Sequence, residues 1–508
     1  MSVSTIGRAH YFSEKPQPKG DTCYNMPDIL QPHGFNHTHS LMTTDDKPTL
    51  SPHIFKANDI RGIVDETLTE QTVRQIGHAL GTVAHERGIA TLVLGRDGRL
   101  SGERLLTALA QGIVLAGVDV IDIGMVPTPT LYFATAYFKT GSGVAVTGSH
   151  NPPNYNGLKI MLGGTTLHGA HINNLRERIV NGQLHTAHTE GVVRAENILP
   201  AYIDALIDDV RLARPMTVAI DCGNGVGGVA AVEIFERLGC TVIDLFCEVD
   251  GRFPNHHPDP AEAENLRDLQ KALRESDAEI GLAFDGDADR LGVVTKSGDI
   301  IYPDRQVMLF AEDVLANHPG APIVFDVKCS AHLAPLIERH GGVPVMWKTG
   351  HSFMKAKMHD TGAPFGGELS GHLFFADRWG GFDDGLYAGA RLLAILAQLP
   401  DAAAITAKLN GLPQAISTPE LHIAINEGEG HALIEQLECV GVFHGARINT
   451  VDGVRADYVD GFGLARASNT TPVIVLRFEA DHLDALHRIQ HDFRLALLAL
   501  IPDATLPF

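Results

Sequence analysis

One stretch of the chain, residues 146–160, combines side chains that suit a nucleophilic hydroxyl group. An apolar run just before it predicts a strand, and the glycine, prolines and asparagines that follow predict a turn with Ser149 exposed at its tip. His150 offers this hydroxyl a proton acceptor, and Lys159, expected on the next strand, offers positive charge. The pattern indicates a serine that accepts a phosphoryl group. An ordinary turn with an incidental serine is the alternative.

A second stretch, residues 284–290, places three carboxylates at alternate positions after an apolar strand. In an extended segment, Asp285, Asp287 and Asp289 point to one side and offer oxygen ligands to a hard divalent cation such as Mg²⁺. An EF-hand loop begins similarly, but Arg290 stands where that loop needs glycine, and its last ligand position is a lysine. A solvated acidic turn is the remaining alternative.

Two further loops carry polar groups suited to a sugar and its phosphate. Glycines flank Glu368, Ser370 and His372, so the backbone can approach a ligand while the carboxylate accepts from two hydroxyls. Residues 466–472 offer a guanidinium, hydroxyls and an amide in a turn, which suits a phosphate cradle. A strand-connecting turn and a plain polar loop are the respective alternatives. The candidate phosphate ligands are Arg466, Ser468, Asn469 and Thr470.

The composition limits the classes of protein to which this chain can belong. At 508 residues it is too long for one core, so about three or four domains are expected. A formal charge of −21 argues against nucleic acid or an anionic membrane as the main partner. No apolar run approaches the roughly 20 residues that cross a bilayer. The six scattered cysteines indicate neither a disulfide framework nor a thiolate metal site, and no signal segment opens the chain, which favours the cytoplasm.

A strand, a glycine-containing loop and a helix follow one another three times, which predicts three similar α/β domains. The helix that precedes the first strand is expected over residues 72–87, and the next one begins at Ser101. The last part of the chain differs, because strand signals at 420–425 and 473–478 and a helix over 481–500 predict a smaller α+β domain. The three repeated strands are expected at residues 91–95, 217–221 and 322–326.

The domain limits follow from these repeats. Residues 1–48, rich in His, Pro, Asn and Thr, are expected to form a disordered extension. We expect either that Met42 is the natural start or that residues 1–41 are dispensable. Linkers are expected near residues 196–200, 296–301 and 400–413. The expected domains are 49–197 with the serine turn, 198–298 with the three carboxylates, 299–411 with the sugar loop and 412–508 with the phosphate loop.

A glycine pattern suggests a function of another class. Gly223, Gly225 and Gly228 follow a predicted strand with the spacing of a dinucleotide-binding loop, and Asp244 lies near the position of a ribose-binding acid. Such glycines more often serve tight packing at a strand-to-helix turn. A nicotinamide-dependent dehydrogenase therefore remains an alternative function.

The serine stretch also carries a resemblance. Thr-Gly-Ser-His-Asn-Pro at 147–152, followed by Tyr-Asn-Gly-Leu-Lys at 155–159, closely resembles the phosphoserine loop of the α-D-phosphohexomutase superfamily, specifically its bacterial phosphomannomutase/phosphoglucomutase branch. Similar family motifs run from Phe55 to Pro472 in the family's order. The resemblance implies four domains around a central cleft, three of them similar mixed α/β domains and the last a smaller C-terminal α+β domain.

The resemblance also implies roles for residues that spacing alone leaves open. It implies one Mg²⁺ per chain, held by Asp285, Asp287, Asp289 and the phosphate of Ser149, with Arg290 beside the phosphoryl group. It places Arg61 near the phosphoserine, and proton transfer falls to Lys159 or His150, without a choice between them. Residues implied to contact the substrate are Asn58, Arg61, Arg290, Lys328, His351, Glu368, Ser370, His372, Arg466, Ser468, Asn469 and Thr470.

Four departures from related patterns are visible. Ala288 stands where the family usually has glycine, so this position cannot adopt a positive φ cheaply. Asn58 stands where this branch often has tyrosine. Leu369 and the loop at 466–472 differ from the related phosphoglucosamine mutases, which favours glucose and mannose phosphates over an amino sugar.

The implied reaction interconverts hexose 6-phosphates and 1-phosphates through a hexose 1,6-bisphosphate. Glucose 1,6-bisphosphate is the expected activator. A monomer is expected, with hexose phosphates as its partners and no nucleic acid or membrane. Phosphoglucosamine mutase and a metal-dependent sugar phosphatase that uses Ser149 are the alternative enzymes. A non-catalytic sugar-phosphate-binding protein is the remaining rival.

Overall fold

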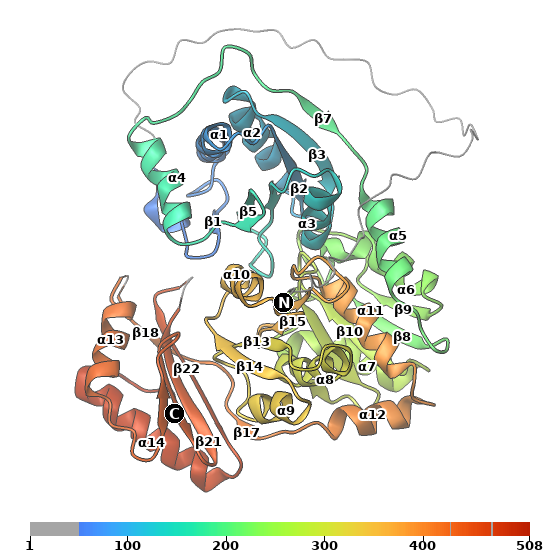
Figure 1. Ribbon diagram of the computed structural model, residues 1–508, viewed down its shortest axis with the longest axis vertical. Helices are drawn as coiled ribbons and strands as arrows, with labels where there is room; N and C mark the ends of the chain where they lie inside the picture. Colours follow the sequence, from blue (N-terminus) through green and yellow to red (C-terminus); the bar gives the residue numbers. More distant parts are fainter. Residues whose placement is uncertain (1–49, 427, 469–470) are drawn as a thin grey trace, which may run out of the picture. The chain divides into compact units, whose positions relative to one another are not determined.

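The computed structural model describes residues 50–426, 428–468 and 471–508. This part of the chain contains four β-sheets, each with helices against it (Figure 1). The first three sheets mix parallel and antiparallel strands, and the fourth is antiparallel throughout. The predicted fold class, three mixed α/β domains and a smaller C-terminal α+β domain, is confirmed. The expected extension, residues 1–48, lies outside the described residues.

The first domain is built on a seven-stranded sheet in the order β1-β5-β4-β2-β3-β7, with β6 beside β5. Its strands are β1 (Ile60–Ile63), β2 (Thr91–Arg96), β3 (Asp119–Met125), β4 (Gly143–Val146), β5 (Tyr155–Leu162), β6 (Thr165–Thr166) and β7 (Val193–Ala195). Its helices are η1 (Pro52–Ile54), α1 (Glu70–Glu86), α2 (Gly102–Leu115), α3 (Thr128–Tyr137) and α4 (Ala170–Val180). The hairpin β4–β5 carries the predicted serine turn between its strands.

The second domain has a five-stranded sheet in the order β12-β11-β10-β8-β9. Its strands are β8 (Thr217–Asp221), β9 (Thr241–Leu245), β10 (Ile280–Phe284), β11 (Leu291–Thr295) and β12 (Ile300–Ile301). Its helices are α5 (Leu199–Asp209), η2 (Val226–Val229), α6 (Ala231–Arg237), η3 (Ala263–Leu266) and α7 (Arg267–Glu275). The three predicted carboxylates occupy the turn between the antiparallel strands β10 and β11.

The third domain has a four-stranded sheet in the order β14-β13-β15-β16. Its strands are β13 (Pro322–Asp326), β14 (Val343–Trp347), β15 (Phe365–Gly367) and β16 (Leu373–Phe375). Its helices are α8 (Pro303–Asn317), α9 (Leu333–Arg339), α10 (His351–Thr361), α11 (Gly385–Leu396) and α12 (Ala402–Asn410). The linker expected over residues 400–413 is wrong in most of its length, because α12 occupies it with Ile405 and Leu409 buried.

The C-terminal domain holds an antiparallel sheet in the order β17-β22-β21-β20-β19, with β18 also paired to β22. Its elements are β17 (Ile416–Ser417), β18 (Leu421–Ala424), α13 (Gly430–Val440), β19 (Arg447–Asn449), β20 (Val454–Tyr458), β21 (Gly461–Ala467), β22 (Val473–Ala480) and α14 (Leu483–Leu500). The two predicted strands and the terminal helix are confirmed. The middle strands lacked a sequence signal, because glycines and arginines interrupt the apolar alternation that marks a strand.

The hydrophobic core is divided between two parts of the chain. One cluster runs through the first three domains and includes Val93 of β2, Phe284 of β10 and Phe375 of β16. The C-terminal domain has a separate core, in which Phe478 and Phe493 pack edge to face at 5.4 Å. The first three domains therefore stabilise one another by shared apolar burial, whereas the fourth folds around its own centre and shares a smaller apolar cluster, Val327 with Phe462 and Leu464, with the third domain.

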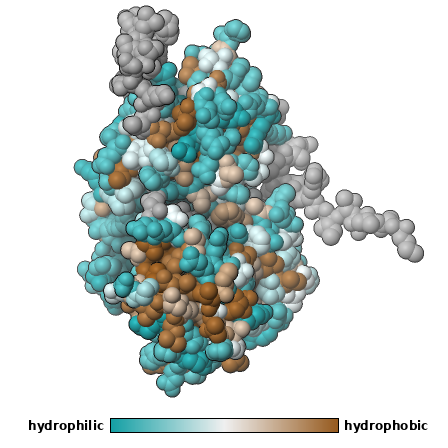
Figure 2. Space-filling view, turned by 90° about the vertical axis from the view of Figure 1, so that its left-hand side faces the viewer, coloured by the Kyte–Doolittle hydropathy of each residue, from teal (hydrophilic) through white to brown (hydrophobic). Residues whose placement is uncertain are grey.

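Apolar side chains also gather on the surface of the C-terminal domain, as Figure 2 shows over the lower part of its view. None of the helices in the described ranges combines the length and apolarity that a membrane crossing requires. The exposed large hydrophobic residues described in this domain are Ile416, Val440, Val442, Ile448, Val459, Leu483 and Leu495.

A buried carboxyl group joins the second and third domains. Asp384 caps α11 by accepting from Tyr387 N at 2.9 Å, and it also accepts from the hydroxyl of Tyr202 on α5 and from Trp379 Nε1, each at 3.0 Å. Burial raises the pKa of Asp384 to about 7, even though these hydrogen bonds act in the opposite direction.

We expect this carboxyl to make stability pH-dependent. Between about pH 4 and 7 the folded chain retains a proton that the unfolded chain has lost, so the folded state loses stability as the pH rises through this range. Asp384→Asn has no such proton to lose. The difference in thermal midpoint, Asp384→Asn minus the unchanged protein, should therefore be larger at pH 8 than at pH 5 by about 2 °C or more.

The matched control is Asp401→Asn, at the exposed N-cap of α12, where the carboxylate accepts from Ala404 N at 2.9 Å. Its Tm difference from the unchanged protein should be the same at both pH values. An equally constant difference for Asp384→Asn would contradict the buried proton.

Candidate active site

Ser149 lies in the turn between β4 and β5, but it is not exposed as expected. Its relative exposure is 1 %, because the turn between β10 and β11 covers it. Ser149 Oγ donates to Asp285 Oδ2 at 3.0 Å. The two turns approach so closely that a Cβ on Gly286 would lie 2.3 Å from Ser149 O, so glycine is required there. The prediction of an exposed hydroxyl is therefore wrong for this structure, since a neighbouring domain supplies the cover.

Arg99 fixes the backbone of the serine turn. Its fully buried guanidinium donates to four carbonyl oxygens of residues 149–155, among them Ser149 O at 2.8 Å and Tyr155 O at 3.0 Å. Asp97 pairs with Arg99 Nε at 3.1 Å and accepts from Thr147 Oγ1 at 2.8 Å. No sequence signal marks this pair, because an Asp-Gly-Arg loop resembles an ordinary turn.

Asp285, Asp287 and Asp289 converge as their alternation predicted. All three are fully buried, and one oxygen from each lies within 4.8 Å of the others. Lys159 on β5 donates to Asp287 Oδ2 at 2.7 Å and also to Asp289 Oδ2. Burial, followed by the charges of Asp289 and Asp287, raises the pKa of Asp285 well above its ordinary value.

This cluster suits a hard divalent cation. Among the described residues, Asp287 Oδ1 is buried and has no hydrogen-bond partner, which leaves an oxygen lone pair inside the cluster. Three carboxylates that share one space repel one another, and a cation between them would relieve that repulsion. Lys159 supplies positive charge at the same place. Although burial opposes it, the charges of Asp287, Asp289 and Asp285 raise the pKa of Lys159 above its ordinary value.

Ala288 adopts the strained conformation that its sequence position suggested. Its φ is 59°, in the left-handed region that glycine occupies without cost. For an alanine this conformation costs roughly 1–2 kcal/mol. The turn is held in place by two hydrogen bonds, from Ala288 N to Asp285 O and from Gly385 N to Ala288 O, each at 3.0 Å.

Three other predicted residues lie around the serine turn. Arg61 on β1 donates to Asn151 Oδ1 and, at 2.5 Å, to Asp59 Oδ2. His150 Nδ1 lies 2.7 Å from Asp259 Oδ2, and burial, followed by the charge of Arg290, lowers the pKa of His150 below its ordinary value. Asn58 accepts from Ser352 Oγ of α10 at 2.6 Å, so it links the first domain to the third.

The predicted sugar loop, residues 366–372, lies directly against the turn of carboxylates. Arg290 and His372 form an antiparallel bridge, and His372 Nε2 lies 3.3 Å from Asp289 Oδ1. Although burial opposes it, the charge of Asp289 raises the pKa of His372 to about 9. Ser370 Oγ lies 2.9 Å from His372 Nδ1.

The third domain contributes three further predicted residues, Glu368, His351 and Lys328, and the last of them contacts the C-terminal domain. Glu368 Oε1 accepts from Gly350 N at 2.6 Å, beside His351, whose Nδ1 lies 3.7 Å from Asp383 Oδ2. Lys328 Nζ donates to Glu420 of the C-terminal domain at 2.6 Å.

The predicted phosphate loop, residues 466–472, begins on β21, which ends at Ala467. Arg466 Nε donates to Asp452 Oδ2 at 2.8 Å, and Thr349 N donates to the same oxygen at 3.0 Å, so Asp452 connects this loop with the third domain. Ser468 Oγ lies 3.0 Å from Thr471 Oγ1. Asn469 and Thr470 lie outside the described residues. Asp452 was missed in the sequence, because an isolated Asp-Gly pair carries no sign of its distant partners.

The glycine-rich loop after β8 serves close packing, the alternative to dinucleotide binding that the sequence left open. A Cβ on Gly228 would lie 1.9 Å from Cys247 O, and one on Gly225 would lie 3.0 Å from Gly286 O. These glycines therefore bring the loop against its neighbours, including the turn of carboxylates. The structure thus accounts for the spacing without a dinucleotide.

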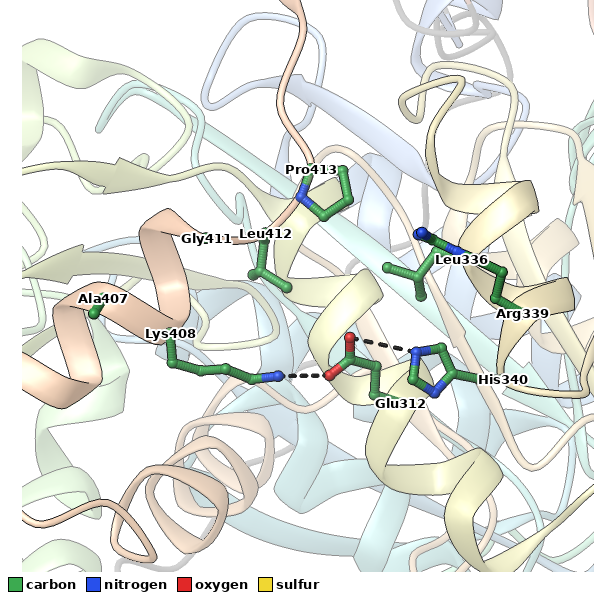
Figure 3. A pocket seen from close by; sticks show the side chains of 9 residues that line it. All are labelled: Glu312, Leu336, Arg339, His340, Ala407, Lys408, Gly411, Leu412 and Pro413. Atoms are coloured by element: carbon green, nitrogen blue, oxygen red, sulfur yellow. Dashed lines mark hydrogen bonds and ion pairs between the residues drawn. The ribbon is translucent and has the colours of Figure 1, made fainter.

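A separate surface pocket contains none of the predicted site residues (Figure 3). Glu312 pairs there with Lys408 at 2.7 Å and with His340 at 3.6 Å. Its remaining lining residues are Leu336, Arg339, Ala407, Gly411, Leu412 and Pro413.

Family models match four consecutive parts of the chain. Three are described as phosphoglucomutase/phosphomannomutase, alpha/beta/alpha domains I, II and III, and the fourth as the C-terminal domain of the same family. The matched residues are 52–185, 200–298, 302–410 and 420–496.

Individual relatives match over nearly their whole lengths. A phosphoglucomutase of Neisseria gonorrhoeae is 55% identical over 448 residues, which cover 88% of this chain and 97% of the relative. A phosphomannomutase/phosphoglucomutase of Pseudomonas aeruginosa is 53% identical over 467 residues, covering 92% and 100%. The crystal structure of a phosphoglucomutase/phosphomannomutase family protein from Burkholderia thailandensis superposes with a TM-score of 0.86 at 53% identity, covering 90% and 100%.

We predict that Arg99 is essential for the folded serine turn. Arg99→Ala leaves Asp97 buried without its partner and removes the donors of four carbonyl oxygens, so the thermal midpoint should fall by about 6 °C or more. Arg104→Ala, which breaks a solvent-exposed pair with Asp65, is the control and should lower the midpoint by less than about 4 °C. Equal shifts for both variants would contradict the role given to Arg99.

Proposed function

Since the chain belongs to the phosphoglucomutase/phosphomannomutase family of the α-D-phosphohexomutase superfamily, we propose that it interconverts the 6-phosphates and 1-phosphates of glucose and mannose. One observation carries the proposal. The Ser149 hydroxyl lies 3.0 Å from a buried carboxylate in a cluster of three, and Lys159 pairs with the other two. Such a hydroxyl can exchange a phosphoryl group where cations offset the charge that develops on oxygen.

In this proposal Ser149 carries the phosphoryl group in the resting enzyme. It donates the group to the free hydroxyl of a hexose phosphate, and the resulting 1,6-bisphosphate reorients and returns its other phosphoryl group to the serine. Arg61 and Arg290 lie where they can offset phosphoryl charge, since they contact Asn151 of the serine turn and Asp285 respectively. Lys159 or His150 transfers the proton of the sugar hydroxyl.

The cluster of Asp285, Asp287 and Asp289 would hold Mg²⁺, together with the phosphate on Ser149. When bound, the cation would offset charge on the serine oxygen as it leaves phosphorus. Lys159 keeps Asp287 and Asp289 in place by its two ion pairs. The tight cover over Ser149 excludes water, which would otherwise hydrolyse the phosphoserine.

Substrate recognition is proposed to come from the third and fourth domains. Glu368, Ser370 and His372 contact the sugar hydroxyls, and the loop at 466–472 holds the phosphate that does not react. The division suits a sugar that must bind in two opposite orientations, because a fixed phosphate clamp can serve both. The remaining proposed contacts are Asn58, Lys328, His351, Arg466, Ser468, Asn469 and Thr470.

We extend the proposal to five further properties. Glucose 1,6-bisphosphate is the activator, because it can phosphorylate an enzyme that has lost its phosphoryl group. The enzyme is a cytoplasmic monomer with one Mg²⁺ per chain. The domains divide at residues 49–197, 198–298, 299–411 and 412–508.

The decisive experiment is a coupled assay with glucose 1-phosphate and mannose 1-phosphate, Mg²⁺ and a trace of glucose 1,6-bisphosphate. We expect 6-phosphate from both sugars, and a loss of about 10³-fold or more in turnover for Ser149→Ala. Ser297→Ala, on an exposed turn, is the control and should retain full activity. Release of inorganic phosphate in proportion to the substrate lost would instead identify a phosphatase.

A metal titration tests the cluster of carboxylates. Asp287→Asn removes one anionic ligand and weakens the pairing with Lys159, so the Mg²⁺ concentration for half-maximal activity should rise by about tenfold or more. Asp299→Asn, an exposed carboxylate on the turn after β11, should leave it unchanged. The same Mg²⁺ requirement for both variants would remove Asp287 from the ligand set.

A further inference from the structure

Two cysteines that the proposed reaction does not use lie side by side in the second domain. Cys222 directly follows β8, and Cys247 comes two residues after β9. Their sulfur atoms are 3.4 Å apart. Cys222 is fully buried, whereas Cys247 is partly exposed. The pair therefore combines one thiol that a small oxidant can reach with a second thiol directly behind it.

The backbone already holds these two segments together. Cys222 N donates to Leu245 O at 3.2 Å, and Asn224 N donates to Phe246 O at 2.8 Å. A disulfide has sulfur atoms about 2.05 Å apart, so the two sulfurs need to approach by only a little more than about 1 Å. Such a bond can form without separating β8 from β9.

The same segment touches the turn of carboxylates. Cys222 O accepts from Gly225 N at 2.7 Å, and the next residue, Val226, donates from its N to Gly286 O at 3.1 Å. Gly286 stands between Asp285 and Asp287. A displacement of Cys222 toward Cys247 is therefore passed on, through two hydrogen bonds, to the backbone that positions two of the three carboxylates.

We propose that Cys222 and Cys247 are a redox-sensitive pair that forms a reversible disulfide with a hydroperoxide and thereby lowers the activity of the site. The effect on activity rests on the proposed function, whereas the disulfide itself does not. Cys247 ionises, and its thiolate attacks a peroxide oxygen of hydrogen peroxide, so that the O–O bond breaks and a sulfenic acid forms. The departing hydroxide takes up the proton that the thiol released and leaves as one water.

The second step closes the bond. The sulfur of Cys222 attacks the sulfenic sulfur of Cys247, the S–O bond breaks, and the hydroxyl leaves as a second water with the proton of the Cys222 thiol. In total the two thiols lose two electrons and two protons, and hydrogen peroxide becomes two waters. A dithiol such as dithiothreitol reverses the reaction by thiol–disulfide exchange.

The experiment treats the full-length enzyme with hydrogen peroxide and compares it with two variants. Cys247→Ser removes one partner, and Cys439→Ser removes an exposed cysteine on α13 as the matched control. Unreduced peptide mapping should find Cys222 linked to Cys247 in the unchanged enzyme and in Cys439→Ser. Both should lose activity by about fivefold or more and recover it with dithiothreitol. Cys247→Ser should show neither the link nor the loss.

Two results would overturn the inference. If peroxide oxidises Cys439 while no linked Cys222–Cys247 peptide appears, the pair is not a disulfide site. If the linked peptide forms and activity is unchanged, the connection to the carboxylates is wrong. Peptide mapping needs no activity, so a failure of the proposed function, visible as an absence of mutase activity before treatment, is distinct from both results.

Discussion

Mutual repulsion among three buried carboxylates is the constraint on which the rest of the site depends. Asp285, Asp287 and Asp289 are all fully buried and lie close together, so they require positive charge nearby. Lys159 comes from the first domain and His372 from the third, and both reach the carboxylates of the second. The same ion pairs that allow the cluster to exist therefore also hold three domains together at one point.

The fourth domain is joined to the others in a different way. Its main core is separate, and it meets the third domain through a small apolar cluster of Val327 with Phe462 and Leu464. Polar contacts add to this interface, such as Lys328 with Glu420 and Arg466 with Asp452 against Thr349 N. That apolar cluster is small beside the core that joins the first three domains, and polar contacts can be exchanged for contacts with water at small net cost. A domain attached in this way is suited to holding a ligand that enters and leaves, while the first three domains keep the reacting groups fixed.

Local sequence patterns predicted the elements near the site well. Apolar runs followed by turn residues located β4, β5, β8, β10 and β13 closely, because a strand and its turn depend on neighbouring residues. The same patterns gave a wrong prediction over residues 400–413, where the short alanine-rich helix α12 stands in place of the predicted linker. The patterns also missed β20 and β21. On β20, Arg455 is buried by partners from another domain, the carbonyl oxygens of residues 327 and 329.

By itself, the sequence determined which groups are available: a serine in a tight turn, carboxylates at alternate positions and glycine-flanked polar loops. These features are local, so spacing and turn chemistry are enough to identify them. Only the tertiary structure decided that Ser149 is covered, that Arg99 holds its turn and that Lys159 pairs with Asp287 and Asp289. Each of these depends on residues from elements far apart in the chain, and pairing of that kind leaves no periodic signal in a single sequence.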